Sequence, residues 1–370
     1  MNKIEKIKYP SINGLRAVSI IFVVIHHLSI KNNIFQGVTE YKWLSPFTSF
    51  LSDGHLGVNV FFVISGFLIT SLLLQEEMQW KTISLKNFYI RRTLRIFPAY
   101  YFLLLVYFIF QLFDFIHIKN SSWFTALTYT KYFNWYSDWV TAHAWSLSIE
   151  EHFYIFWPLI FKSGDKIRKW TPIILVILVP IIRTIVYFHP IAHVNELTIF
   201  TRIDAIAIGC LFALFKKDIL KIISPHWSKI FFISIFTLFS LRYFPYIADK
   251  LHLGLGLIFK PFDLTNGTIA SFLISLIMMY SIFGPQKRWF KILNLPILNY
   301  IGLLSYSIYL WQQVFISGSK YWVTKFPQNL IFLFLMSMFS YYIVEKPFLK
   351  LKKKFSYTKL YGHLKRTKKT

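Results

Sequence analysis

Charged residues are what this sequence has least of. Only 15% of its 370 residues are charged, whereas soluble proteins carry about 25%. The shortage is mainly of one sign, since 16 Asp and Glu accompany 41 Lys and Arg, for a formal net charge of +25. So few charges cannot cover the surface of a large soluble enzyme, which excludes that class as the main interpretation. Basic nucleic-acid-binding proteins are not 55% hydrophobic, so we also expect no nucleic-acid partner.

Cysteine and metal-binding motifs are scarce as well. A single cysteine, Cys210, rules out a disulfide within the chain. His26 and His27 are adjacent rather than four residues apart, and no His-Glu-x-x-His motif occurs, so we expect no metal site. The first apolar run follows several lysines but lacks an Ala-x-Ala-like cleavage site, which predicts a retained helix rather than a secretory signal.

The sequence is instead rich in long apolar segments. A helix needs about 20 apolar residues to cross a bilayer. Runs near that length recur at 13–30, 56–75, 97–116, 144–161, 171–188, 203–215, 230–247, 266–284, 297–317 and 328–345. We therefore predict an all-α polytopic membrane protein with about ten transmembrane helices, forming one domain over residues 1–349. A basic tail follows at 350–370.

The basic residues predict how these helices are oriented. If the N-terminus defines one side of the membrane, 28 of the 41 Lys and Arg fall on that side and 8 on the other. Basic residues concentrate in cytoplasmic loops. Both termini are therefore expected in the cytoplasm, which requires an even number of spans. The bilayer is the expected partner of the tail, because its charges suit acidic lipid headgroups.

Two ionisable residues interrupt the first apolar run. Such residues are costly inside a membrane and indicate a functional site by default. Arg16 and His27 are three helical turns apart, so they share one helix face and are separated by about 16 Å along the axis. His26 is rotated by about 100° and is expected to face elsewhere. The alternative is an interfacial arginine that reaches the headgroups and a histidine at the helix end.

The fourth run carries a second polar group near its start. His143, Ser146 and Glu150 follow spacings of three and four residues, which places them on one helix face. The sixth run opens with Arg202 and Asp204, either a functional pair or a local anchor. If these residues converge with His27, a neutral histidine oriented by a carboxylate can accept a proton from a hydroxyl.

Arginines in the predicted loop before the third span are a further candidate. Arg92 and Arg95 are three residues apart and share a face if this loop is helical. Forked guanidinium groups suit phosphate oxygens, as in a nucleotide-bearing cofactor. A cytoplasmic topology anchor explains the same residues equally simply.

Together these residues resemble the membrane acyltransferase family 3, the O-acetyltransferases of bacterial surface polysaccharides. The resemblance extends over nearly the whole chain. Its motifs, in chain order, are Arg16-x10-His27, the run that contains Ser65-Gly66, Arg92-x-x-Arg95, the run from Trp145 to Tyr154 around Glu150, Arg202-Ile-Asp204 and Glu345-Lys346-Pro347-Phe348.

The resemblance implies transfer of an acyl group, usually acetyl, from cytoplasmic acyl-CoA to a sugar hydroxyl at the outer side of the bacterial inner membrane. The acceptor would be a glycan such as O-antigen or capsule, or a lipid-linked sugar. By position, Arg16 and His27 match the family's essential pair, Arg92 and Arg95 its acyl-CoA loop, and His143 and Glu150 its fourth-helix motif. The hypothesis is that His27 acts as base or acyl carrier, tuned by Glu150 or His143, and that the arginines hold the phosphates. Further polar candidates are Ser65, Ser146, Arg202 and Asp204.

The sequence departs from the family at one informative position. Many relatives have a histidine after the tryptophan of the ninth span, whereas here Gln312 follows Trp311. Any role of that histidine is absent or taken by an amide that cannot titrate. No SGNH-type hydrolase domain follows the tenth span, so we expect the stand-alone form.

Two alternatives remain at this stage. The intramembrane charges are also compatible with a transporter of a glycan or lipid-linked sugar, although inverted repeats are not evident. The acyl group is also open, for example succinyl in place of acetyl. Tryptophans in the loops 31–55 and 117–143, among them Trp139, can either stack on sugars or anchor the chain at the membrane interface.

Overall fold

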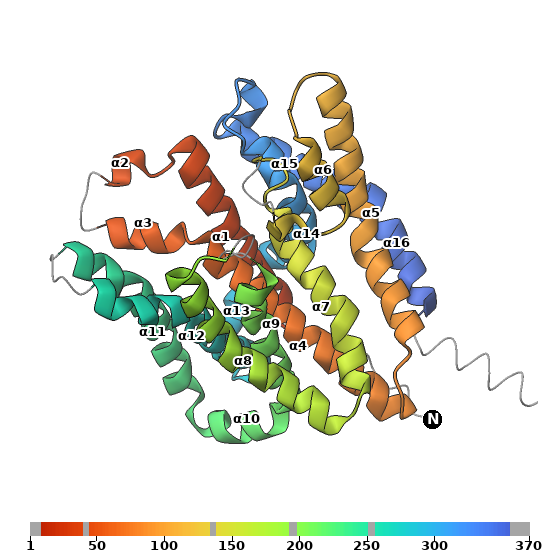
Figure 1. Ribbon diagram of the computed structural model, residues 1–370, viewed down its shortest axis with the longest axis vertical. Helices are drawn as coiled ribbons and strands as arrows, with labels where there is room; N and C mark the ends of the chain where they lie inside the picture. The colour runs from red at the N-terminus through yellow and green to blue at the C-terminus, as the bar shows by residue number, and fades with distance from the viewer. Residues whose placement is uncertain (1–8, 40–43, 134–137, 192–197, 251–255, 356–370) are drawn as a thin grey trace, which may run out of the picture.

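A computed structural model describes residues 9–39, 44–133, 138–191, 198–250 and 256–355, and these fold into helices joined by short connections (Figure 1). The helices are α1 (Ile12–Asn32), α2 (Gln36–Thr39), α3 (Ser45–Leu51), α4 (Gly54–Trp80), α5 (Leu85–Leu112), α6 (Asn120–Leu127), α7 (Ala144–Lys162), α8 (Asp165–Phe188), α9 (Ile199–Leu214), α10 (Lys216–Ile223), α11 (Trp227–Lys250), α12 (Gly256–Phe283), α13 (Arg288–Leu293), α14 (Pro296–Phe315), α15 (Gln328–Phe339) and α16 (Lys346–Lys352). The π-helical segment η5 (Ser340–Glu345) joins α15 to α16, and single 3-10 turns lie at Lys131–Phe133, Ser224–His226, Trp322–Thr324 and Lys353–Phe355.

All ten predicted apolar runs lie on helices, which confirms the all-helical class. Within the described residues, six helical segments are long and apolar enough to cross a membrane. They are Ile12–Asn32, Gly54–Trp80, Leu85–Leu112, Asp165–Phe188, Lys216–Leu241 and Gln328–Phe355. The count of ten spans and the cytoplasmic position of the termini remain predictions, and most of the basic tail, from residue 356, lies outside the described residues.

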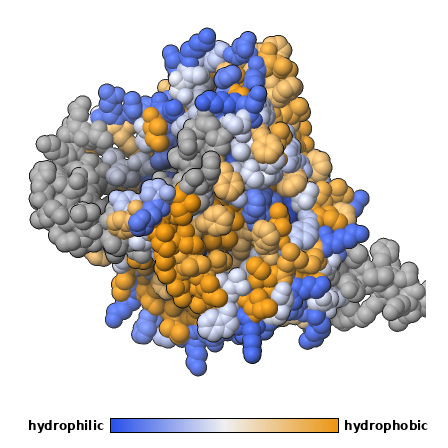
Figure 2. Space-filling model, viewed as in Figure 1, coloured by the Kyte–Doolittle hydropathy of each residue, from blue (hydrophilic) through white to orange (hydrophobic). Residues whose placement is uncertain are grey.

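The surface of the protein has the distribution expected of a membrane protein. An apolar area covers the middle of the molecule in Figure 2, and hydrophilic residues gather at its upper and lower ends. Large apolar side chains such as Ile177 on α8 and Phe232 and Phe236 on α11 are more than half exposed. Helix α10 and the α7–α8 junction lie at the lower end in Figure 1, while α2 and α6 lie at the upper end. This alternation of connections is what membrane-crossing helices require.

Close packing of α4 against α9 fixes the centre of the fold. A Cβ atom on Gly66 would lie 2.0 Å from the carbonyl oxygen of Ile206, and one on Gly209 would lie 2.2 Å from that of Val63. Small residues of this kind let membrane helices approach closely where burial of apolar area gives no driving force. Helix α9 is short for a span, but most of its residues are buried between α4, α8 and α12.

Helices α4 and α5 begin before the apolar runs predicted for them, and a capping side chain precedes each helix. Asp53 caps α4 by accepting a hydrogen bond from the backbone N–H of Leu56 at 3.0 Å. Ser84 caps α5 in the same way through Asn87 at 3.3 Å. Because this cap starts α5 at Leu85, the expected loop before the third span is instead helical, and its arginines are carried on the first turns of α5.

Candidate active site

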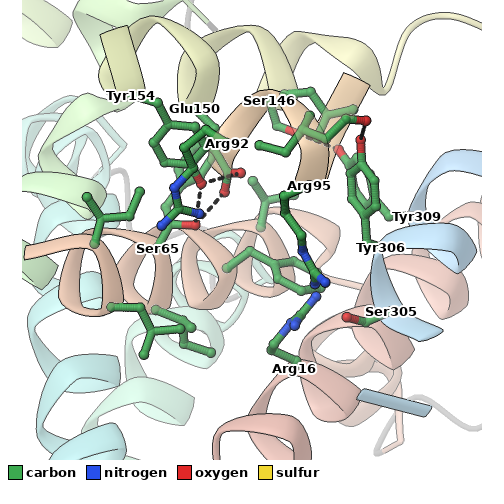
Figure 3. Close-up of a pocket in the computed structure, with 18 of the residues that line it drawn as sticks. Arg16, Ser65, Arg92, Arg95, Ser146, Glu150, Tyr154, Ser305, Tyr306 and Tyr309 are labelled. Atoms are coloured by element: carbon green, nitrogen blue, oxygen red, sulfur yellow. Dashed lines mark hydrogen bonds between the residues drawn. The ribbon is translucent and has the colours of Figure 1, made fainter. Parts of the chain in front are cut away.

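Two cavities lie between the central helices. The first, the arginine cavity, has a volume of about 270 Å³. Its polar lining comes from Arg16, Ser65, Arg92, Arg95, Ser146, Glu150, Tyr154, Ser305, Tyr306 and Tyr309 (Figure 3), and from Lys352. The second, the histidine cavity, has a volume of about 460 Å³, and its polar and aromatic lining includes His26, His27, His55, Asp138, Trp139, His143, Trp145, Tyr309 and Gln313. Two residues, Val58 on α4 and Tyr309 on α14, line both cavities. The cavities are therefore neighbours that share one wall.

The three arginines of the arginine cavity come from two helices. Arg16 of α1 and Arg95 of α5 extend toward each other (Figure 3). The guanidinium carbon of Arg92 lies 5.0 Å from the ring centroid of Tyr154. In the described part of the chain none of these arginines forms an ion pair with a carboxylate. Forked donors that are not held in an ion pair are suited to bind an anionic ligand.

Glu150 belongs to this cavity and is held by hydroxyl groups. Ser65 donates a hydrogen bond to one carboxylate oxygen at 3.0 Å, and Tyr154 donates to the other at 3.0 Å. The two hydroxyl oxygens are themselves 2.9 Å apart. The sequence predicted that Glu150 would act beside His27, but the structure places it on the arginine side. Seven residues separate it from His143, about 10 Å along α7, so the shared helix face spans both cavities.

Two consecutive glutamines of α14 contact two histidines of the histidine cavity, although only the second, Gln313, lines the cavity itself. Nδ1 of His27 lies 3.0 Å from Oε1 of Gln312, and Nδ1 of His143 lies 2.6 Å from Oε1 of Gln313. An amide oxygen only accepts hydrogen bonds, so each Nδ1 carries the proton and each Nε2 is left as the basic atom. The amide nitrogen of Gln313 lies 3.4 Å from Nε2 of His27, which links the two histidines through one side chain.

His143 is the more enclosed of the two histidines. It is 2% exposed, and its Nε2 atom is buried without a hydrogen-bond partner in the described residues. His26 was expected to face away from His27, but it also lines this cavity, where it donates a hydrogen bond to the backbone oxygen of Ser52 at 2.7 Å. The adjacent positions of His26 and His27 still place them on different sides of α1, and the cavity is wide enough to reach both.

One wall of the histidine cavity comes from the segment before α7. Trp139 packs edge to face against His27, with ring centroids 5.3 Å apart, and donates a hydrogen bond to the backbone oxygen of Gln313 at 2.9 Å. Asp138 is paired with the fully buried Lys131 at 2.9 Å. Burial raises the pKa of the Asp138 carboxyl, but hydrogen bonds from Ser122 and the Lys131 ammonium outweigh it and hold the pKa below its usual value. The predicted aromatic positions 43 and 135 lie outside the described residues.

The remaining predicted polar residues have other partners. Asp204 was expected to pair with Arg202, but it forms a buried ion pair with Arg183 of α8 and accepts a hydrogen bond from Thr268 of α12. Asp204 is oriented inward among α8, α9 and α12, so this pair ties three helices together and lies outside both cavities. Ser146 lies 2.5 Å from the hydroxyl oxygen of Tyr309.

Several residues of the site were not singled out in the sequence. Tyr309 and Gln313 lie on α14 without a diagnostic spacing, and Tyr154 is one aromatic among many. Glu345 was noted only as part of a motif. It is 3% exposed at the end of η5 and accepts a hydrogen bond from Ser307 of α14. The π-helical turn, a feature often found at functional sites, carries this carboxylate into the protein.

Comparison with known proteins identifies the fold family. The acyltransferase domain family matches residues 9–344, which include every residue of both cavities except Lys352. The chain belongs to this family. No solved structure matches it.

Among curated relatives, the O-acetyltransferase OatA of Staphylococcus aureus strain NCTC 8325 is 29% identical over 370 residues, covering 91% of this acyltransferase chain and 57% of that protein. A protein of S. aureus strain COL that is provisionally named an O-acetyltransferase is 29% identical over 382 residues, covering 94% of this chain and 58% of that protein. The chain thus spans less than two thirds of the length of these relatives. The shared part is the helical acyltransferase domain, which supports O-acetylation in general.

Proposed function

We propose that this membrane acyltransferase transfers an acetyl group from cytoplasmic acetyl-CoA to a hydroxyl of a cell-surface glycan, at the outer side of the bacterial inner membrane. The observation that carries the proposal is the pair of adjoining cavities. One contains arginines that form no ion pair within the described residues and the other contains two histidines whose Nδ1 atoms contact glutamine amides, and α1 contributes Arg16 to the first and His27 to the second. The excess of basic residues on the side of the N-terminus supports an orientation in which the arginine cavity faces the cytoplasm.

The arginine cavity suits the donor. Arg16, Arg92 and Arg95 would bind the phosphates of CoA, because guanidinium groups bind phosphate oxygens through paired N–H donors. Their position near the ends of α1 and α5 makes them accessible from the cytoplasm in this orientation. Glu150 would not touch the donor's phosphates. It holds Ser65 and Tyr154 in place and keeps the ring of Tyr154 against Arg92.

The histidine cavity suits the acid–base step. His27, kept in its Nδ1–H form by Gln312, would accept the proton of the glycan hydroxyl at Nε2. As the hydroxyl oxygen forms a bond to the acetyl carbon, the carbon–sulfur bond of the thioester breaks. His27 then returns the proton to the departing thiolate, so the products are an O-acetyl ester and free CoA. The side chain of Gln313 contacts both His143 and His27 and so connects the two histidines. Trp139, which packs against His27, would provide an aromatic ring for stacking of a sugar.

The experiment is a comparison of two histidine variants in cells that lack the native gene. His27→Ala should abolish acetylation of the surface polysaccharide, measured by NMR of the extracted glycan, while the amount of protein in the membrane stays unchanged. His226→Ala is the matched control, because His226 is exposed in the connection between α10 and α11 and should leave acetylation at the wild-type level. Full acetylation by His27→Ala would refute the assignment and favour the alternative, a glycan transporter.

A further inference from the structure

The two cavities have two lining residues in common. Val58 of α4 and Tyr309 of α14 line both cavities, and each is only 6% exposed. We call the boundary that these two residues form the neck. A group that moves directly from the arginine cavity to the histidine cavity would pass these two side chains.

Tyr309 is held rigidly at the neck. Its hydroxyl group donates a hydrogen bond to the backbone oxygen of His143 at 2.9 Å, and the Ser146 hydroxyl is 2.5 Å away (Figure 3). On its other side the ring packs against Phe61, with centroids 6.2 Å apart, and against His143 at 5.6 Å. A ring fixed on all sides cannot move aside without breaking buried hydrogen bonds, which costs about 1–3 kcal/mol for each group left unsatisfied.

The neck is apolar where a chain would pass it. Val58 contributes an aliphatic side chain and Tyr309 an aromatic ring, and no charged side chain lines both cavities. An apolar boundary of this kind would admit the carbon chain of an acyl group according to its size. One methylene more or less in a closely fitted apolar pocket changes catalytic efficiency by about 10- to 200-fold.

We propose that Val58 and Tyr309 select the acyl group by its length and restrict the donor to short chains such as acetyl. This inference rests on the proposed function, because it assumes that the thioester end of acyl-CoA reaches His27 through the neck. It adds two specificity-determining residues that take no part in proton transfer. The bulk of the Val58 side chain is the element that limits the chain, since Tyr309 is fixed by its hydrogen bonds.

The test compares kcat/KM for acetyl-CoA, propionyl-CoA and butyryl-CoA, with unmodified polysaccharide from a gene-deletion strain as acceptor. Val58→Ala should raise the butyryl-to-acetyl ratio at least tenfold by opening the neck. Val58→Ile should lower the propionyl-to-acetyl ratio. The matched control is Val63→Ala, the same loss on the same helix, because Val63 is buried against α9 and lines neither cavity.

The outcomes separate the two proposals. The neck alone would be overturned if the wild-type protein transfers acetyl but neither Val58 variant changes the selectivity. In that case the butyryl-to-acetyl ratio of Val58→Ala and the propionyl-to-acetyl ratio of Val58→Ile would both stay within twofold of the wild-type values. An equal change in Val63→Ala would also overturn it, since the effect would then come from packing of α4. A wild-type protein that transfers no acyl group from any donor would overturn the proposed function and the neck together.

Discussion

Oε1 of Gln312 lies 3.0 Å from Nδ1 of His27, and Gln312 is completely buried. Gln312 is the position at which we expected a departure from the family pattern, and this contact places its amide oxygen against His27. It gives His27 an acceptor that has the same protonation state at every pH. The proton of the imidazole is thereby kept on Nδ1, and Nε2 faces the cavity as a base.

Replacing Gln312 with Leu should lower kcat for acetyl transfer by about tenfold, the kinetic equivalent of one hydrogen bond of ~1.4 kcal/mol. The KM for acetyl-CoA should stay near the wild-type value, because Gln312 lines neither cavity. Steady-state kinetics with membrane-reconstituted protein measures both. A large rise in KM with an unchanged kcat would contradict a role in positioning His27.

Gln312→His should retain the activity that Gln312→Leu loses, but only in part of the pH range. A neutral imidazole can accept the proton of His27 Nδ1, whereas an imidazolium cannot. The variant should therefore approach wild-type activity at alkaline pH, where the new imidazole is neutral, and lose more activity than the wild type as the pH falls. A pH–rate profile of the variant that matches the wild-type profile at acidic pH would show that position 312 does not need to accept a proton.

Arg95→Gln should raise the KM for acetyl-CoA by about 10- to 100-fold, because a hydrogen bond to a charged group contributes about 1.5–3 kcal/mol. The kcat at saturating donor should change much less. Arg288→Gln is the control, since Arg288 is exposed at the start of α13 and far from the cavity lining. Equal KM values for both variants would remove Arg95 from the donor site.

The buried pair of Arg183 and Asp204 provides a test of the fold. Arg183→Met leaves Asp204 buried without its cation, which should lower the free energy of unfolding by about 3–5 kcal/mol. Arg202 is the partner that the sequence suggested. Arg202→Met should lower the free energy of unfolding by less than Arg183→Met does, because Asp204 keeps its buried cation in that variant. Thermal unfolding in detergent measures both. A larger effect at Arg202 than at Arg183 would contradict the packing of α8 against α9.

Gly66→Ala should destabilise the protein through the crossing of α4 and α9. The added methyl group would meet the carbonyl oxygen of Ile206 at 2.0 Å, so one helix has to shift, and overpacking of this kind costs about 1–3 kcal/mol or more. Because Ser65 is the neighbouring residue, the shift should also reduce acetyl transfer. Gly37→Ala is the control, since a Cβ atom there meets nothing within 4 Å. Unchanged stability of Gly66→Ala would refute the close crossing.

The sequence predicted the helices well because apolar length is a local property. Each of the ten predicted runs lies on a helix, and Arg16 and His27 share one face of α1 as their spacing requires. Contacts between helices were predicted less well. The partner of Asp204 is 21 residues away on another helix, and nothing in the local pattern distinguishes Arg183 from the nearer Arg202.

Glu150 shows the same limit within one helix. The spacing of three and four residues correctly placed Glu150 on the face of α7 that carries His143 and Ser146. The spacing could not predict that α14 would separate one end of this face from the other. Tyr309 of α14 closes the space between the two ends, so Glu150 belongs to one cavity and His143 to the other. The roles of Gln312 and Gln313 also required the tertiary structure, since each acts only through a histidine of a different helix.

The central claim is a reaction that connects the two sides of the membrane, and the most direct measurement is its sidedness. Inside-out and right-side-out membrane vesicles with equal amounts of the protein would receive acetyl-CoA labelled in the acetyl group from outside. Unmodified polysaccharide from a gene-deletion strain would be enclosed in the first and added outside the second. We predict labelled polysaccharide in the inside-out vesicles, none with His27→Ala, and none in the right-side-out vesicles, whose arginine cavities face the lumen. Equal labelling in both kinds of vesicle, or labelling that survives His27→Ala, would contradict the account.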